Sequence, residues 1–378
     1  MGTRKIEAWH KAGVIDAATR DRLIAHEAAH ARPIALWAVF GIGALAIGLG
    51  LVSVVAANWE DIPGGLRLGV HLTLIAAGVA TLATRPQRLA ALPPFAEEAL
   101  LFVIGALGLT FFGHLGQVYQ TASPLWQALA LWLVLFAPLL LLMGRGLTVA
   151  SAVMGVLIWA LWDYAGHHAA VSGTALALWL ALVTALPVVA APLGGWLRQT
   201  SARPDFWRRV EQLGLAYAVA GAALASVLAS TNALDDKAAL SGFAAMGLRA
   251  AIGCGAGLAL MAARPGMSGR MAGAIIAGAG LVVLLAVPLN GLDFLPALLF
   301  MALWTGIAAA ALKAGWRGVF QLAVGMVALR LIIVSFELAS DLLLSGFGLI
   351  IAGLLILGIG WAALKVSRTY APESEDGA

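Results

Sequence analysis

The chain has 378 residues, of which 62% are hydrophobic and 11% are charged, and its formal net charge is +4 at pH 7. Soluble proteins carry about 25% charged residues, so this composition excludes a soluble globular domain and predicts an all-α polytopic membrane protein. The sequence contains one cysteine, Cys254, which excludes an internal disulfide framework and a cysteine-based metal cluster.

Residues 1–33 are the polar start of the chain and predict a short cytoplasmic helical hairpin. Gly13 is expected at the turn, Asp16 is a favourable N-cap for the second helix, and Pro33 ends that helix before the membrane. This hairpin is a candidate docking site for a cytoplasmic protein.

The hairpin also carries the sequence HEAAH at His26–His30, which has the spacing of the zinc-protease motif H-E-x-x-H. A catalytic zinc needs a third protein ligand and a walled cleft, and the short polar segment cannot supply them. Arg22, one helical turn before His26, would also place a positive charge beside the metal. We therefore interpret the motif as a solvated helix face, and we expect no catalytic residue, metal or cofactor.

Apolar stretches long enough to cross a bilayer occupy most of residues 34–366. We predict twelve transmembrane helices in this domain, with the fifth and ninth the weakest, and a disordered cytoplasmic tail at 367–378. The predicted spans are 34–57, 66–84, 96–119, 124–143, 146–162, 173–192, 213–230, 243–263, 271–287, 294–312, 316–336 and 343–364.

The basic residues give the orientation of these spans. If the N-terminus is cytoplasmic, 19 of the 23 Lys and Arg residues fall in inner segments, as the positive-inside rule requires. The exceptions are Arg67, Lys237, Arg249 and Arg330. We therefore expect both termini inside, and the longest inner connection, at 193–212, divides the spans into two groups of six.

Several polar residues lie within or beside the predicted spans, where a buried charge is costly and often marks a pathway or a pocket. By the predicted topology they gather in the outer half of the membrane. Such a group is suited to bind an anion, because the guanidinium fork matches carboxylate and phosphate. The candidate binding residues are Arg67, His71, His114, Gln117, Tyr119, Arg249 and Arg330.

The same arginines have a second interpretation as buried ion pairs that fix the positions of the helices. Glu337 and Asp341 are candidate partners, because they share one helical stripe with Arg330. Glu60 and Asp61 are further candidates from the first outer loop.

Two other sets of ionisable residues have their own interpretation. His71, His114, His167 and His168 are candidates for a proton relay, since histidine titrates near neutral pH, and His167 and His168 are otherwise interpreted as loop residues. Glu97 and Glu98 occupy the first turn of the third span, and we expect them to stabilise the N-terminus of that helix.

Short motifs are spread along the chain. The hairpin has the pattern W-x-x-x-G-x-I followed by Leu and Glu, an Asn-Trp pair follows the first span, and G-Q-x-Y ends the third. The residues are Trp9, Gly13, Ile15, Leu23, Glu27, Asn58, Trp59, Gly116, Gln117 and Tyr119, with Asp341, Leu342, Gly346, Gly353, Gly360 and Trp361 near the C-terminus. This pattern resembles a family of predicted bacterial multi-pass inner-membrane proteins of unknown function. The resemblance implies a polytopic fold in the bacterial inner membrane and no particular activity.

The leading functional prediction is a transporter or lipid-handling protein that binds an anionic small molecule or a lipid headgroup. The alternative is a non-transporting membrane scaffold or sensor whose hairpin binds a cytoplasmic protein. A membrane-embedded transferase is the least favoured, because His114 is the only plausible base within a span. We therefore predict a protein that is not an enzyme, that contacts membrane lipids and that binds no nucleic acid.

Overall fold

The structure, a computed structural model, describes residues 3–30, 62–84, 95–120, 123–169, 173–234, 242–292, 294–338 and 346–370. By its internal contacts the chain divides into two compact units, Met1–Arg67 and Leu68–Ala378. Within the described ranges, every regular element of both units is a helix.

The described part of the first unit includes a helical hairpin of α1 (Thr3–Lys11) and α2 (Ala17–His30). Gly13 has a φ of +72° at the turn, a left-handed conformation that suits glycine. Asp16 caps α2, because its carboxylate accepts a hydrogen bond of 2.9 Å from the Thr19 N–H. Hydrogen bonds from the side chain and backbone of Thr19 lower the pKa of Asp16 from its usual value. Pro33 and the first predicted span lie outside the described residues.

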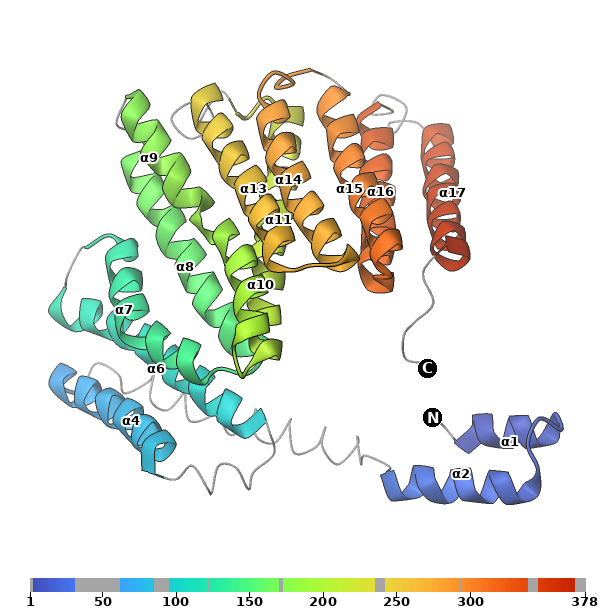
Figure 1. Cartoon of the computed structure of the whole chain (residues 1–378), viewed down its shortest axis with the longest axis horizontal. Coiled ribbons are helices and arrows are strands. Elements are labelled where there is room, and N and C mark those ends of the chain that lie inside the picture. Colours follow the sequence, from blue (N-terminus) through green and yellow to red (C-terminus); the bar gives the residue numbers. More distant parts are fainter. Residues whose placement is uncertain are drawn as a thin grey trace. The chain divides into compact units, whose positions relative to one another are not determined.

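The second unit is a bundle of helices, several of which are joined by short turns (Figure 1). Its first helix, α4 (Gly64–Thr84), begins just before the division between the units. The others are α6 (Phe95–Tyr119), α7 (Leu125–Met143), α8 (Leu147–His168), α9 (Thr174–Ala185), η1 (Leu186–Val189), α10 (Ala190–Thr200), α11 (Pro204–Ser230), α13 (Phe243–Ala263), α14 (Met267–Ala286), α15 (Leu295–Ala314), α16 (Arg317–Leu338) and α17 (Gly346–Tyr370).

Ten helical segments in the described ranges are long and apolar enough to cross a membrane. They correspond to the second to eleventh predicted spans, and the two weakest predictions among them form α8 and α14. The twelfth predicted span, at 343–364, falls mostly on α17. The chain is therefore a polytopic helical membrane protein, as its composition predicted.

The inner connection predicted at 193–212 differs from the structure. α10 continues to Thr200 and α11 begins at Pro204, so that only residues 201–203 separate the two helices. The polar residues of 193–212 therefore lie mostly on the ends of α10 and α11. Helix ends can carry polar residues, because long basic side chains extend past the apolar layer into water.

Two large apolar clusters form the interior of the second unit. One joins α4, α6, α7 and α8 with the start of α11, and it includes Trp132, which is 1% exposed. The other joins α10, α11, α13, α14, α15 and α16, and it includes Leu260 and Ile276. The apolar helices thus supply both the buried core and the exposed apolar surface, as expected for a protein in a membrane.

Helices α13 and α14 approach each other closely through small residues. A Cβ atom added at Gly257 would lie 2.5 Å from the carbonyl oxygen of Gly273, and one added at Gly253 would lie 3.0 Å from the Cα of Gly280. Since no side chain fits at the first distance, glycine is required there for the two backbones to pack together.

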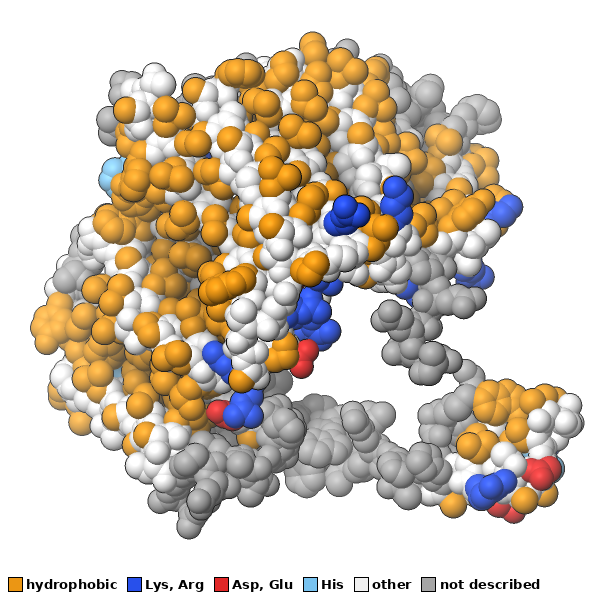
Figure 2. Space-filling view, in the orientation of Figure 1, with side chains coloured by type: hydrophobic (Ala, Val, Ile, Leu, Met, Phe, Trp, Pro, Cys, Tyr) orange, Lys and Arg blue, Asp and Glu red, His pale blue; other side chains and the backbone are white. Residues whose placement is uncertain are grey.

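Lys and Arg side chains of the second unit gather at one end of its helices, which we call the basic end (Figure 2). The residues that define it lie at or just beyond helix ends and are Arg198, Arg203, Arg264, Arg270, Lys313 and Arg317. By the positive-inside rule this end is expected to face the cytoplasm.

Candidate functional site

The structure brings together some of the candidate residues. His71 and His114 lie side by side, with their Nδ1 atoms 2.9 Å apart. Arg330 has other partners, although it is only 5% exposed. Its Nη2 donates to Ser230 Oγ at 2.7 Å, and its Nη1 lies 3.5 Å from Glu337 Oε1.

The remaining candidates are more dispersed. Arg67, which belongs to the first unit, donates from Nε to the carbonyl of Ile62 at 2.7 Å. Gln117 and Tyr119 are exposed near the end of α6. The proposed acidic partners Glu60, Asp61 and Asp341 lie outside the described residues.

Arg249 lines a cavity of about 280 Å³ in the second unit, and it is the only one of the seven candidates in the lining. The cavity lies between α8, α9, η1, α11, α13 and α14. Its lining is almost entirely apolar. The lining side chains that carry polar atoms are Trp162, Thr184, Tyr217 and Arg249.

A stripe of α11 forms one wall of this cavity. Tyr217, Gly221, Leu224 and Leu228 recur at helical spacing along it. Leu224 is 55% exposed, and Gly221 is also exposed. The cavity is therefore open along this part of α11, in the middle of a helix that is long enough to span a membrane.

The polar side chains of the lining are joined by hydrogen bonds around Thr184. Arg249 donates to Thr184 Oγ1 from Nε at 3.2 Å and from Nη2 at 3.0 Å, and Thr184 Oγ1 in turn lies 2.7 Å from the carbonyl of Leu180. The Tyr217 hydroxyl donates to the carbonyl of Thr184 at 2.5 Å and accepts from Trp162 Nε1 at 2.9 Å. These bonds hold the guanidinium at the cavity wall.

Thr184 lies at a break within a membrane-spanning segment. α9 ends at Ala185, the 3-10 turn η1 follows, and α10 begins at Ala190. Pro187 lies in this turn and has no N–H to donate, so the regular helical hydrogen bonds are interrupted there. The bond from Tyr217 to the carbonyl of Thr184 supplies a donor beside this interruption. The sequence signal for this break is a proline within an apolar span.

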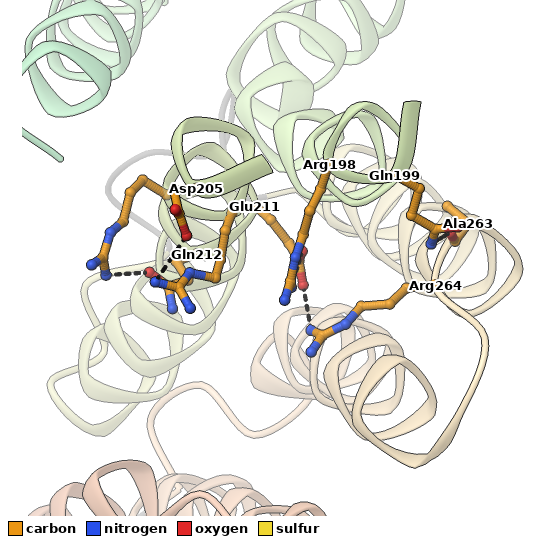
Figure 3. A network of polar contacts seen from close by, with 9 residues as sticks. Arg198, Gln199, Asp205, Glu211, Gln212, Ala263 and Arg264 are labelled. Carbon is orange, nitrogen blue, oxygen red and sulfur yellow. Dashed lines mark hydrogen bonds and ion pairs between the residues drawn. The ribbon is translucent and has the colours of Figure 1, made fainter. Parts of the chain in front are cut away.

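A second polar network lies at the basic end, where Glu211 of α11 is 3% exposed (Figure 3). Its Oε1 lies 2.6 Å from Arg264 Nη1, and its Oε2 lies 3.3 Å from Arg198 Nη1. One carboxylate thus ties together the ends of three helices. The sequence predicted that Glu211 lies in the connection at 193–212. Burial of a helix end against neighbouring helices depends on residues far apart in the chain, so no local sequence pattern indicates it. We interpret this network as structural.

Glu98 lies in the first turn of α6, as predicted, and its carboxylate also contacts the N-terminus of the neighbouring helix α8. Its Oε2 accepts from the N–H groups of Arg145 and Gly146 at 2.9 and 3.0 Å, and its Oε1 accepts from Val149 at 2.9 Å. These groups begin α8, so Glu98 caps the neighbouring helix rather than only its own. Glu97 lies 3.0 Å from Arg145 Nη2.

The HEAAH motif lies at the end of α2, and the side chains of residues 26–30 are outside the described part. Among the residues that the structure describes, no group of three or more His, Cys, Asp or Glu side chains is placed to hold a metal ion.

The fold defines a polytopic helical membrane protein, and its bundle holds a largely apolar cavity with one arginine in the lining. Residues 7–149 match the profile of a family described as predicted membrane protein (DUF2157). This part of the chain is therefore similar to a family of unknown function, in agreement with the resemblance that the sequence motifs indicated. No curated protein and no solved structure matches the chain.

Proposed function

We propose that this protein is a transporter or lipid-handling protein that binds an anionic amphiphile in the cavity beside Arg249. The observation that carries this proposal is a cationic side chain at the wall of an otherwise apolar cavity. Its setting would be a bacterial inner membrane, and its role would be binding or translocation rather than catalysis.

The two parts of the cavity suit the two parts of such a ligand. Alanine, leucine and isoleucine side chains in the lining would contact an acyl chain. The Arg249 guanidinium would bind a carboxylate or phosphate, because its planar fork matches both groups. Because the lining is largely apolar, this attraction is expected to be stronger than at a solvated surface.

The helix break beside Arg249 favours a protein that changes conformation over a static one. Interrupted helices at membrane depth recur at the binding sites of secondary transporters. A 3-10 turn within a longer helix also commonly marks a hinge. The chain between α9 and α10 combines both features and contributes Thr184, Ala185 and Val188 to the lining.

Native mass spectrometry from mild detergent tests this proposal with two variants of the cavity. Arg249→Gln removes the charge, and Gly221→Phe fills the cavity, since a Cβ at Gly221 meets nothing within 4 Å. A charge-assisted hydrogen bond contributes about 1.5–3 kcal/mol, so Arg249→Gln should weaken binding of oleate or phosphatidylglycerol roughly tenfold to hundredfold. Gly221→Phe should abolish it.

Two controls separate binding from general damage. Gly255→Phe places the same side chain at an exposed position of α13 with no atom within 4 Å, outside the cavity. Arg209→Gln removes an exposed charge that contacts Gln212. Both should bind like the unchanged protein. If the unchanged protein binds neither probe, or if all four variants bind equally, the scaffold interpretation replaces this one.

A further inference from the structure

The polar side chains of the Arg249 cavity gather at one place in its lining. The Tyr217 hydroxyl accepts from Trp162 and donates to the carbonyl of Thr184. Arg249 donates to the hydroxyl of the same threonine. The anionic group of a ligand therefore has one polar place in the cavity, around Thr184, and the rest of the lining is apolar.

The cavity extends from this polar place mainly in one direction. α11 begins beside Arg203 of the basic end, and Tyr217 is the lining residue of α11 nearest that end. The other lining residues of α11 are alanine, glycine and leucine, and the last of them is Leu228. At about 1.5 Å per residue, the wall from Tyr217 to Leu228 is about 16 Å long. This apolar wall leads away from the basic end.

Buried apolar side chains close the far end of the cavity. Leu234 and Met246 both line it, are each 5% exposed, and belong with Ala225 to one apolar cluster. The exposed part of the lining is at the side, at Gly221 and Leu224. A chain that follows the wall of α11 from the polar place therefore ends against Leu234 and Met246.

The size of the cavity suits one chain of about a dozen carbon atoms. A cavity of about 150 Å³ holds one benzene ring, so the cavity of about 280 Å³ holds roughly twice as many carbons. An extended alkyl chain advances about 1.25 Å per carbon, because its bonds of about 1.5 Å zigzag, and a wall of about 16 Å then matches about thirteen carbons. The cavity has room for one such chain and not for two.

We propose that the cavity holds one acyl chain of about twelve carbons, with the anionic group at Arg249 and the chain pointing away from the basic end. This inference rests on the proposed function and adds the orientation and the chain length of the ligand. A lipid in the leaflet beside the basic end has the same orientation, because its headgroup faces that side and its chains point to the bilayer centre. The amphiphile therefore comes from that leaflet, which is expected to be the cytoplasmic one by the positive-inside rule.

Photo-crosslinking of the full-length protein in lipid bilayers with two dodecanoate probes tests the orientation. One probe carries its diazirine beside the carboxylate and the other at the end of the chain, and tandem mass spectrometry locates the labels. The first should label Thr184 or Tyr217 several-fold more strongly than the far end of the cavity. The second should show the opposite preference, for Leu234 or Met246.

An octadecanoate probe with its diazirine at the end of the chain tests the length. Its end cannot fit inside a closed cavity that a shorter chain already fills, so the label on Leu234 and Met246 should fall several-fold. Equal labelling of these residues by the ends of both chains would overturn the chain length.

The variant Gly221→Phe should remove the labels of both dodecanoate probes, whereas Gly255→Phe should keep them. If Gly221→Phe fails to fold, the comparison of the two probes on the unchanged protein decides. Exchanged labels, or both probes on the same residues, would overturn the orientation and leave binding at Arg249 in place. Absence of both labels from the lining would overturn this inference together with the proposed function.

Discussion

Arg249 is half-buried and Glu211 is buried within the second unit, and the surroundings of the two charged residues differ. Arg249 lies beside an open apolar cavity and donates to a neutral hydroxyl. Glu211 has two arginines within 3.3 Å of its carboxylate oxygens and lies where three helix ends meet. The first arrangement leaves room for a ligand, whereas the second fills its space with protein.

Removal of the Glu211 carboxylate should destabilise the protein. Loss of one partner from a buried ion pair costs about 3–5 kcal/mol, and here the lower end applies because both arginines are partly exposed. Glu211→Gln should therefore lower the free energy of unfolding by about 3 kcal/mol, measured by denaturant unfolding in detergent micelles.

Asp205→Asn is the matched control for Glu211. Asp205 lies 3.4 Å from Arg208 in the same region (Figure 3), but its side chain is 80% exposed. Exposed pairs contribute about 1 kcal/mol or less, so this change should have little effect. Equal losses for the two substitutions would contradict a structural role for the Glu211 network.

The residue scale also shows what the sequence could predict about the sites. Depth along a span, counted from the flanking charges, was enough to select Arg249, His71 and His114 as unusual. It could not pair them, because the contact between His71 and His114 joins residues 43 positions apart. The depth of a residue also could not show that Arg330 lies apart from the other candidates. Its partners include Ser230 on another helix.

At the scale of helices, the apolar pattern predicted the spans but not their true ends. Hydropathy marks the part of a helix inside the bilayer, and α11 extends well beyond its predicted start at residue 213 to Pro204. Polarity does not mark the break at η1, since Leu186–Val189 is as apolar as the helices on either side. Pro187, which restricts the backbone, is the residue that distinguishes it.

The close contact of α13 and α14 gives a direct test of this packing. Gly257→Leu would place a side chain against the Gly273 backbone, where a Cβ lies 2.5 Å from the carbonyl oxygen. Overpacking costs about 1–3 kcal/mol, and a backbone clash belongs at the upper end of this range. Thermal unfolding in detergent should therefore shift to a clearly lower temperature.

Gly255→Leu, two residues earlier on α13, should leave the unfolding temperature nearly unchanged, because a Cβ there meets nothing within 4 Å. A similar loss of stability at both positions would mean that the substitution acts through the helix itself and not through the contact between α13 and α14.

At the scale of the whole molecule, charge and apolar surface divide the second unit into regions with different roles. The basic end gathers Lys and Arg side chains (Figure 2), and under the positive-inside rule this end is expected to face the cytoplasm. The exposed leucines of the helices, such as Leu224 and Leu258, suit contact with lipid. The Arg249 cavity opens along α11, so an amphiphile would enter from the surrounding membrane rather than from water.

Photo-crosslinking with a diazirine-bearing fatty acid in native membranes tests this account most directly. We predict a label on α11 between Tyr217 and Leu228, reduced by excess oleate and by Gly221→Phe but not by Gly255→Phe. Labels spread over the exposed helix faces, with the same intensity in both variants and no competition by oleate, would contradict the presence of an amphiphile-binding site at Arg249.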